Sequence, residues 1–125
     1  TRIVIDKNLG IPAHYHIFND AAKTIIFNEV KTAVVDNIHF VQMEDMHFYL
    51  PQKIAYQLYL MDIQSVIIEG GANILSQFIA ANLWDEARIF TSKTEWKKGL
   101  EAPKIIGNIL EDITIGDDNL KILKR

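Results

Sequence analysis

The feature that most constrains this chain is the segment from Ser65 to Leu75, which reads Ser-Val-Ile-Ile-Glu-Gly-Gly-Ala-Asn-Ile-Leu. A short apolar run ends in a carboxylate and two glycines, and an amphipathic helical pattern begins at once. This order predicts a buried strand over residues 66–68, a tight turn, and a helix from Ala72 to Leu83. It places Glu69 at the carboxyl end of a strand and backbone N–H groups at a helix start, an arrangement that suits a phosphate-bearing ligand.

The rest of the chain predicts an α/β fold with a mixed sheet. A strand–helix–strand–helix–strand order through the middle is typical of a right-handed parallel crossover, and a C-terminal hairpin adds antiparallel strands. The predicted strands cover residues 2–6, 24–27, 32–35, 38–41, 66–68, 85–91, 112–115 and 119–123, and the predicted helices cover residues 50–62 and 72–83. The first helix has an apolar stripe of Ile54, Leu58 and Met61 with Ala55 and Tyr59 beside it, and the second buries Ile74, Leu75, Phe78 and Ile79.

Composition excludes several classes of function. The 125 residues fit one domain, and a net charge of −3 without a lysine or arginine cluster argues against nucleic-acid binding. The absence of cysteine excludes disulfides, thiolate zinc sites and a cysteine nucleophile. No apolar run approaches a membrane span, and no signal peptide precedes the first strand, so we expect no membrane partner and a cytoplasmic location. A strand pattern that starts directly at Thr1 indicates a piece of a longer protein.

Two interpretations of the glycine pair stay open on composition alone. Any α/β protein can need a tight turn with positive φ, and this would explain both glycines without a ligand. Alternatively, the N–H groups of Gly71, Ala72 and Asn73 face an anion at the helix start, with Glu69 beside it. The segment has neither the dinucleotide pattern GxGxxG nor the Gly-Lys-Ser/Thr of a phosphate-binding loop.

Other polar residues give weaker signals. Asp6 and Lys7 follow the first predicted strand, so Lys7 either meets a cofactor phosphate or forms a solvated surface pair. We expect no metal site, because His14 and His16 lack a third ligand at a known spacing. Charged residues at the start of the strand over 85–91 (Asp85, Glu86 and Arg88) are interpreted as ion pairs that fix its entry, Trp84 and Trp96 as core or interface aromatics, and His39 as a packed or edge residue.

Three segments together resemble one known family. Arg2 to Pro12 is similar to the family pattern R-V-V-L-D-x-x-L-R-I-P, residues 66–75 resemble its EGG segment, and residues 82–90 are similar to its L-x-D-E-x-R-x-x strand. The family is the C-terminal reductase half of the bifunctional diaminohydroxyphosphoribosylaminopyrimidine deaminase/5-amino-6-(5-phosphoribosylamino)uracil reductase of riboflavin biosynthesis. The three motifs occur in the family's order and span most of the chain.

The resemblance implies a dihydrofolate-reductase-like mixed sheet with flanking helices, and NADPH-dependent reduction of the substrate's ribosyl group to ribityl. It implies a substrate-binding role for Glu69, and it assigns the NADPH-binding positions to Gly71, Ala72, Asn73, Ile74, Leu75, Ser76 and Gln77, and to Lys7. Hydride transfer needs no protein nucleophile, and the sequence designates no catalytic residue. The family also implies a small-molecule substrate and a homodimer.

Two departures from the family pattern matter. Gly10 stands where the family often has arginine, and elements that usually precede the segment at Arg2 do not occur in this sequence. The zinc-deaminase signature does not occur either. We therefore expect residues 1–125 to be the C-terminal part of a single reductase domain, a partial domain that is inactive alone. The alternatives are a related dihydrofolate-reductase-like enzyme acting on another pteridine or pyrimidine, and a non-catalytic dimerisation module.

Overall fold

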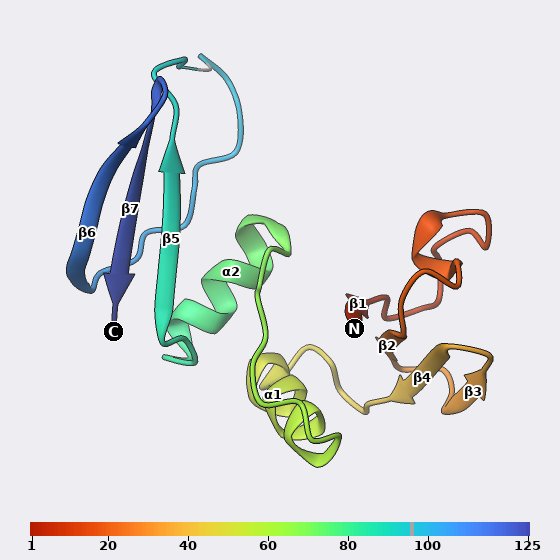
Figure 1. The fold of residues 1–125 in the computed structure, drawn as a ribbon. Helices are drawn as coiled ribbons and strands as arrows, with labels where there is room; N and C mark the ends of the chain where they lie inside the picture. Colours follow the sequence, from red (N-terminus) through yellow and green to blue (C-terminus); the bar gives the residue numbers. More distant parts are fainter. Residues whose placement is uncertain (96) are drawn as a thin grey trace. The chain divides into compact units, whose positions relative to one another are not determined.

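The structure, a computed structural model, describes residues 1–95 and 97–125. These residues form two compact units, Thr1–Asp62 and Ile63–Arg125, and each is described by itself (Figure 1). Within the described part of the chain, no helix has the length and apolar character needed to cross a membrane. The α/β class predicted from the sequence is confirmed, although strands and helices are distributed over both units.

The first unit contains a four-stranded mixed sheet in the order β1-β2-β4-β3. Strands β1 (Arg2–Ile5), β2 (Thr24–Asn28) and β4 (Ile38–Gln42) run parallel, and β3 (Ala33–Val35) pairs antiparallel with β4. These are the four strands predicted for this part of the chain. Strand β2 lies in the middle and is fully buried, because its β-branched and aromatic side chains pack on both faces of the sheet.

A long connection between β1 and β2 is held by one arginine. It includes a short 3-10 helix, η1 (His16–Phe18). The guanidinium group of Arg2 donates hydrogen bonds to the carbonyl oxygens of His16, Asn19 and Ala22, at 2.6, 2.8 and 2.9 Å. An arginine near the start of the first strand therefore fixes the connection predicted as a loop, since one planar fork satisfies three carbonyl groups.

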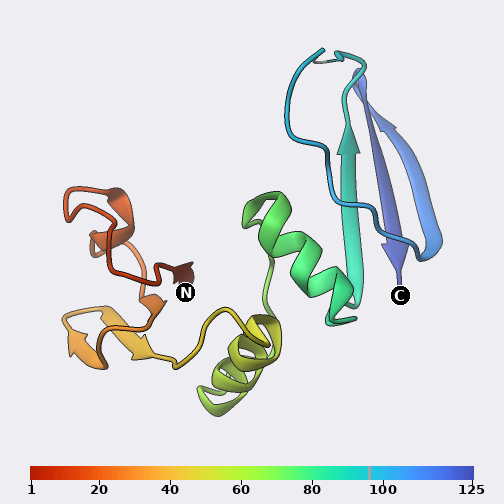
Figure 2. The same cartoon turned by 180° about the vertical axis from the view of Figure 1, so that it is seen from behind.

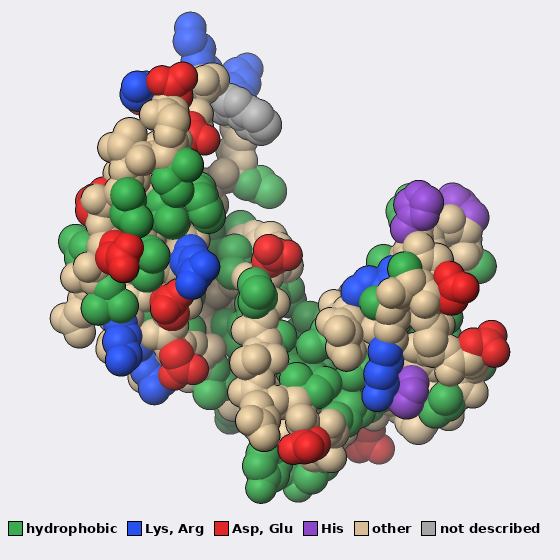
Figure 3. Space-filling model, in the orientation of Figure 1, with side chains coloured by type: hydrophobic (Ala, Val, Ile, Leu, Met, Phe, Trp, Pro, Cys, Tyr) green, Lys and Arg blue, Asp and Glu red, His purple; other side chains and the backbone are tan. Residues whose placement is uncertain are grey.

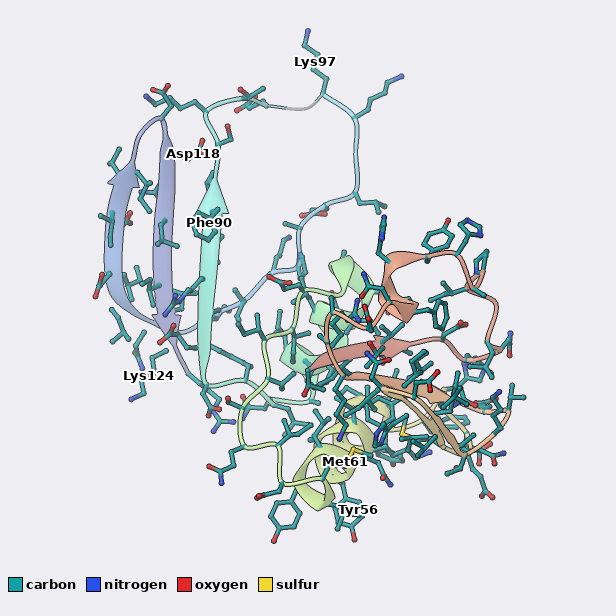
Figure 4. The ribbon with its side chains drawn as sticks, turned by 45° about the vertical axis from the view of Figure 1, so that its right-hand side comes forward. Tyr56, Met61, Phe90, Lys97, Asp118 and Lys124 are labelled. Atoms are coloured by element: carbon teal, nitrogen blue, oxygen red, sulfur yellow. The ribbon has the colours of Figure 1, made fainter. Side chains whose placement is uncertain are left out.

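Helix α1 (Leu50–Leu60) follows the sheet and has the predicted proline in its first turn. Its buried residues, Leu50, Pro51, Ile54 and Leu58, share the inward face. Tyr59, predicted to lie beside the apolar stripe, is 75% exposed. Figure 4 shows Tyr56 projecting outward from α1, and 60% of this residue is exposed. The outer face of the helix is therefore aromatic, with the phenolic hydroxyl groups accessible to water.

The second unit contains helix α2 (Gly71–Ala80) and a three-stranded antiparallel sheet in the order β5-β7-β6. Strand β5 (Glu86–Thr91) pairs with β7 (Asp118–Lys124), which also pairs with β6 (Asn108–Ile115). Figure 1 shows β7 between its two neighbours. The predicted C-terminal hairpin is confirmed, and Gly116 takes a φ of +61° in its turn, where a glycine avoids strain.

One predicted element, the buried strand over residues 66–68, was wrong. Residues 63–69 are described, and they form neither helix nor sheet. Val66 is 45% exposed and Ile67 is 86% exposed. The predicted crossover through the middle of the chain is therefore not formed. An apolar run indicates that a segment can become a strand, but a strand also needs a neighbour for its backbone N–H and C=O groups.

The connection from β5 to β6 returns to the three-stranded sheet and crosses it shortly before β6 begins (Figure 2). Its last part, residues 105–107, lines a hollow of about 380 Å³ together with Ile89 and Leu123. A Cβ atom added to Gly107 would lie 2.6 Å from the carbonyl oxygen of Lys124 and 2.8 Å from the ring of Trp84. Trp84 therefore packs against the backbone, in agreement with its predicted structural role, whereas Trp96 lies outside the described residues.

Candidate functional site

The first part of the candidate site is the turn that leads from Glu69 into α2. The turn requires glycine at its two positions, 70 and 71, for different physical reasons. A Cβ atom on Gly70 would lie 3.1 Å from the side chain of Ile74, so Gly70 permits close packing of the turn on the helix. Gly71 takes a φ of +76°, which favours glycine, and a Cβ atom there would meet nothing within 4 Å. The backbone of Gly71 therefore borders open space.

The N–H groups at the start of α2 differ from the sequence prediction in one respect. The N–H of Gly71 donates to the carbonyl oxygen of Glu69 at 2.8 Å, which closes a three-residue turn. The prediction that this N–H faces a ligand is wrong for the present conformation. The first N–H groups of a helix lack intrahelical partners, and no side chain caps α2. The amides of Ala72 and Asn73 are therefore the donors available to an anion.

The remaining predicted residues of the helix divide into two groups. Ile74 and Leu75 are half-buried and belong to the apolar face that also buries Phe78, so their side chains stabilise the unit. Asn73 and Ser76 are exposed, and the amide nitrogen of Gln77 donates to Asn73 Oδ1 at 2.9 Å. This hydrogen bond orients the side-chain amide of Asn73 in the first turn of α2. The polar face of α2 thus continues from the helix start.

The helix start fits a phosphate group. Two backbone N–H groups, the positive end of the helix dipole and the open space beside Gly71 meet at one place. The carboxylate of Glu69 is exposed two residues before the helix. A carboxylate repels a phosphate, so Glu69 suits a hydroxyl or N–H group of a second ligand instead.

A separate group of candidate residues lies in the first unit, after β1. The carboxylate of Asp6 accepts the N–H groups of Gly10 and Ile11, each at 2.9 Å, and so closes the loop that follows the strand. Asp6 is thereby assigned a structural role. Lys7 Nζ lies 3.3 Å from Glu29 Oε2 and also contacts the Nε2 atom of His47. Lys7 therefore pairs with Glu29 and His47 rather than with Asp6, and 34% of its side chain is exposed.

The sequence analysis did not identify Glu29 and His47 as site residues. Glu29 directly follows β2, so its position after a predicted strand could have indicated it, as the same position after β1 indicated Lys7. Its Oε1 atom accepts the backbone N–H of Met46 at 2.7 Å. This hydrogen bond, followed by Lys7 and His47, lowers the pKa of the Glu29 carboxyl, whereas partial burial opposes the shift.

The charge pair predicted at the start of β5 is confirmed for Glu86 and Arg88, whereas Asp85 lies near Arg125 instead. Arg88 Nε donates to Glu86 Oε1 at 2.8 Å, and a guanidinium nitrogen of Arg125 lies 3.8 Å from Asp85 Oδ1. The part of the chain that the structure describes holds no group of three His, Cys, Asp or Glu side chains placed to bind a metal ion. Lys7 belongs to the first unit, whereas Glu69 and α2 belong to the second.

Comparisons with known proteins agree with this fold. The sequence matches the RibD C-terminal domain family over residues 1–122. Among the similar solved structures are Acinetobacter baumannii RibD (form 2), with a TM-score of 0.78 at 16% identity, and a Thermotoga maritima diaminohydroxyphosphoribosylaminopyrimidine deaminase/5-amino-6-(5-phosphoribosylamino)uracil reductase, with 0.78 at 20% identity. The matches cover 98% of this chain and 37% of each of those chains. No curated protein sequence matches the chain.

Proposed function

The chain belongs to the RibD C-terminal domain family, and from this membership we propose that it is an NADPH-dependent reductase of 5-amino-6-(5-phosphoribosylamino)uracil. The proposed reaction converts the ribosyl group of the substrate to ribityl, in riboflavin biosynthesis. The chain spans 37% of the length of the two RibD proteins described above, so this activity is proposed for the chain rather than transferred from them.

One observation carries the proposal: an exposed carboxylate stands next to an uncapped helix start. The amides of Ala72 and Asn73 bind a phosphate of NADPH, with Gly71 leaving space for its approach. When bound, NADPH supplies the hydride. The chain contributes binding and orientation, which are the main requirements for hydride transfer.

Glu69 is proposed to orient the substrate. Its carboxylate is exposed and accepts hydrogen bonds from the hydroxyl or N–H groups of the phosphoribosylaminouracil. Lys7 is proposed to contact a phosphate, because its ammonium group lies at the carboxyl edge of parallel strands, where ligands bind in open α/β sheets. A homodimer and a cytoplasmic location belong to the same proposal.

A related reductase of another pteridine or pyrimidine is the second candidate. It uses the same cofactor site and differs in the ligand that Glu69 contacts. Binding of the phosphoribosylaminouracil, compared with binding of dihydrofolate, separates the two candidates. A non-catalytic dimerisation module is the third candidate, and it predicts no NADPH binding.

The test measures ligand binding to the chain by isothermal titration calorimetry. NADPH is titrated first, and the phosphoribosylaminouracil is then titrated in the presence of oxidised cofactor, so that no reaction occurs. Glu69→Gln is compared with Glu111→Gln, which removes the same charge from an exposed position in β6. We expect Glu69→Gln to weaken substrate binding about tenfold, since a hydrogen bond to a charged group contributes roughly 1.5–3 kcal/mol.

NADPH affinity should stay within about twofold in both variants, because neither change touches the helix start. Absence of NADPH binding by the unmodified chain would overturn the proposal. Tighter binding of dihydrofolate would favour the second candidate. Equal substrate affinities of the two variants would remove Glu69 from the substrate site.

A further inference from the structure

The segment from Ile63 to Ile68 has the composition of a strand but lies outside both sheets. Its sequence, Ile-Gln-Ser-Val-Ile-Ile, is rich in β-branched residues and holds no charged side chain. Residues 64–67 are exposed, and Ile67 is 86% exposed. Figure 1 shows the segment as an irregular trace that leads into α2. Side chains that a sheet would cover therefore face water.

The backbone of this segment has no partner in the part of the chain that the structure describes. None of the described backbone hydrogen bonds involves an N–H or C=O group of residues 63–68. The bonds resume at both ends, where the N–H of Asp62 donates to the carbonyl oxygen of Tyr59 at 3.0 Å and the N–H of Gly71 to that of Glu69 at 2.8 Å. Residues 63–68 match the usual strand length of about 5–6 residues.

The bare backbone determines which kind of partner can cover this segment. Burial of N–H and C=O groups against a purely apolar surface leaves them without hydrogen bonds, which is costly. The side of a helix offers no row of backbone donors and acceptors, because its own ladder uses them. An extended strand offers a donor and an acceptor at every second residue, and it also covers the apolar side chains. The partner is therefore a β-strand.

The absence of charge favours the same segment of a second copy as that strand. In a two-fold symmetric pair the two strands are antiparallel, and each patch faces itself. Like charges that face each other destabilise such a pair, and residues 63–68 carry none. The exposed edge strand β6 is different, because Glu111 and Asp112 would face the same acids, and a bulge between Ile109 and Glu111 interrupts its edge.

We propose that two copies of this chain associate through residues 63–68, which pair as antiparallel strands across a two-fold axis. The inference deepens the homodimer of the proposed function, on which it rests, by naming the surface that forms it. Successive side chains of a strand alternate, so Val66 and Ile67 lie on opposite faces of the pair. A contact of this size is below that of a stable dimer, and two strands alone are marginally stable, so the association is weak.

The pairing also orders the approach to the candidate site. Glu69 directly follows the paired segment, and α2 begins at Gly71. Pairing fixes residues 63–68 in an extended conformation, so part of the conformational entropy of this region is lost before a ligand binds. Association then strengthens ligand binding at the start of α2, and the ligand strengthens association by the same factor.

The experiment follows association by sedimentation velocity at chain concentrations from about 10 μM to about 1 mM. Ile67→Lys introduces a charge into the segment, and two-fold pairing brings it near the same charge of the second copy. Ile106→Lys is the matched control, because Ile106 is 93% exposed and also lies outside the helices and strands. Both variants should unfold at the temperature of the unmodified chain, since both positions are on the surface.

We expect the unmodified chain and Ile106→Lys to associate with the same midpoint within about twofold, and Ile67→Lys to need at least about tenfold higher concentration. Hydrogen exchange supplies a readout that a nonspecific apolar contact does not change. Exchange should slow with rising concentration at every second amide of residues 63–68, because alternate N–H groups of a strand face its neighbour. The exchange of Ile67→Lys should not depend on concentration.

Several results would overturn the inference. A monomer at every concentration would do so, and so would equal association of Ile67→Lys and Ile106→Lys. Association that leaves the exchange of residues 63–68 unchanged would show that another surface forms the dimer. Equal loss of association in both lysine variants would show that added charge, rather than the paired segment, controls it.

NADPH separates this inference from the proposed function. It is titrated into the chain below and above the association midpoint, and we expect about fivefold tighter binding above it, with no such gain in Ile67→Lys. Equal affinities with association intact would contradict the coupling. If the chain associates as described and NADPH fails to bind, the pairing stands and the reductase proposal falls. If NADPH binds and Ile67→Lys associates like Ile106→Lys, the reductase proposal stands and the pairing falls.

Discussion

Replacement of Gly71 by alanine tests whether this glycine only permits the turn or also leaves space for a ligand. Gly71 and Gly116 have the same two properties: a positive φ, +76° and +61°, and no atom within 4 Å of an added Cβ. Gly71 begins α2, and Gly116 lies in the turn between β6 and β7. Gly71→Ala and Gly116→Ala therefore impose similar backbone strain without a steric clash inside the chain.

The cost in stability follows from the backbone alone. A left-handed conformation costs an L-residue about 1–2 kcal/mol relative to glycine. Both variants should unfold a few degrees lower than the unmodified chain, by similar amounts. A large difference between their unfolding temperatures would show that the added methyl group meets a steric clash at one of the two sites.

NADPH affinity should distinguish the two variants. The Cβ atom of Gly71→Ala would occupy open space at the residue that begins α2, and the phosphate is proposed to bind at the amides of the next two residues, Ala72 and Asn73. Loss of one charge-assisted hydrogen bond, at about 1.5–3 kcal/mol, weakens binding roughly tenfold to a hundredfold. Gly116→Ala should retain the affinity of the unmodified chain within about twofold.

The assay is isothermal titration calorimetry with NADPH at a temperature well below both unfolding transitions. If Gly71→Ala and Gly116→Ala bind NADPH equally well, the glycine has only a backbone role, and the reasoning about the helix start fails. If both variants lose affinity together with stability, the loss reflects unfolding, and the comparison of their transitions detects this.

Three further predictions concern stability and assembly. Gly107→Ala should lower the free energy of unfolding by about 1–3 kcal/mol, because its Cβ would lie 2.6 Å from the carbonyl oxygen of Lys124 and 2.8 Å from the ring of Trp84. An unfolding temperature equal to that of the unmodified chain would contradict this packing. The lowered pKa of Glu29 means that its carboxylate stabilises the folded state above its ordinary pKa of 4.5, and that this contribution is lost as the pH falls through the lower folded-state pKa. Acid unfolding of Glu29→Gln should therefore be flatter than that of Glu44→Gln, and identical profiles would contradict the shift. Sedimentation over a concentration series should detect the proposed homodimer, and a monomer at every concentration would exclude it.

The sequence predicted most elements because their signals are local. The fully buried β2 is a run of β-branched and aromatic residues, and the hairpin between β6 and β7 has a glycine where the turn needs positive φ. Helix α1 has a proline in its first turn and buries Ile54 and Leu58 at helical spacing. Each of these patterns is complete within its own segment.

The errors concern properties that composition and spacing do not determine. The apolar run over residues 66–68 has strand composition, but its state depends on a neighbouring strand. Gly71 was predicted to offer its N–H to a ligand, yet a bond to the Glu69 carbonyl uses it. Tyr59 fits the helical spacing but lies at the edge of the buried stripe, where its hydroxyl reaches water.

In the candidate site, too, contiguous residues were predicted and residues distant in the sequence were not. Glu69 and the start of α2 were found because they are contiguous in the sequence. The association of Lys7 with Glu29 and His47 joins residues that are 22 and 40 positions apart in the sequence (29 − 7 and 47 − 7). Figure 3 shows charged and histidine side chains dispersed over the visible surface, so proximity alone does not single out such a cluster. The hydrogen bond and the ion pair that engage the two carboxylate oxygens of Glu29 do single it out.

The central claim is that the start of α2 binds the phosphate of a nucleotide cofactor. The most direct measurement is a titration of the ¹⁵N-labelled chain with NADPH, followed through the backbone amide resonances. The account predicts that the largest changes occur at Ala72 and Asn73, with smaller changes at Gly71 and Ser76. Saturable NADPH binding that leaves the amides of residues 71–77 unmoved would contradict it.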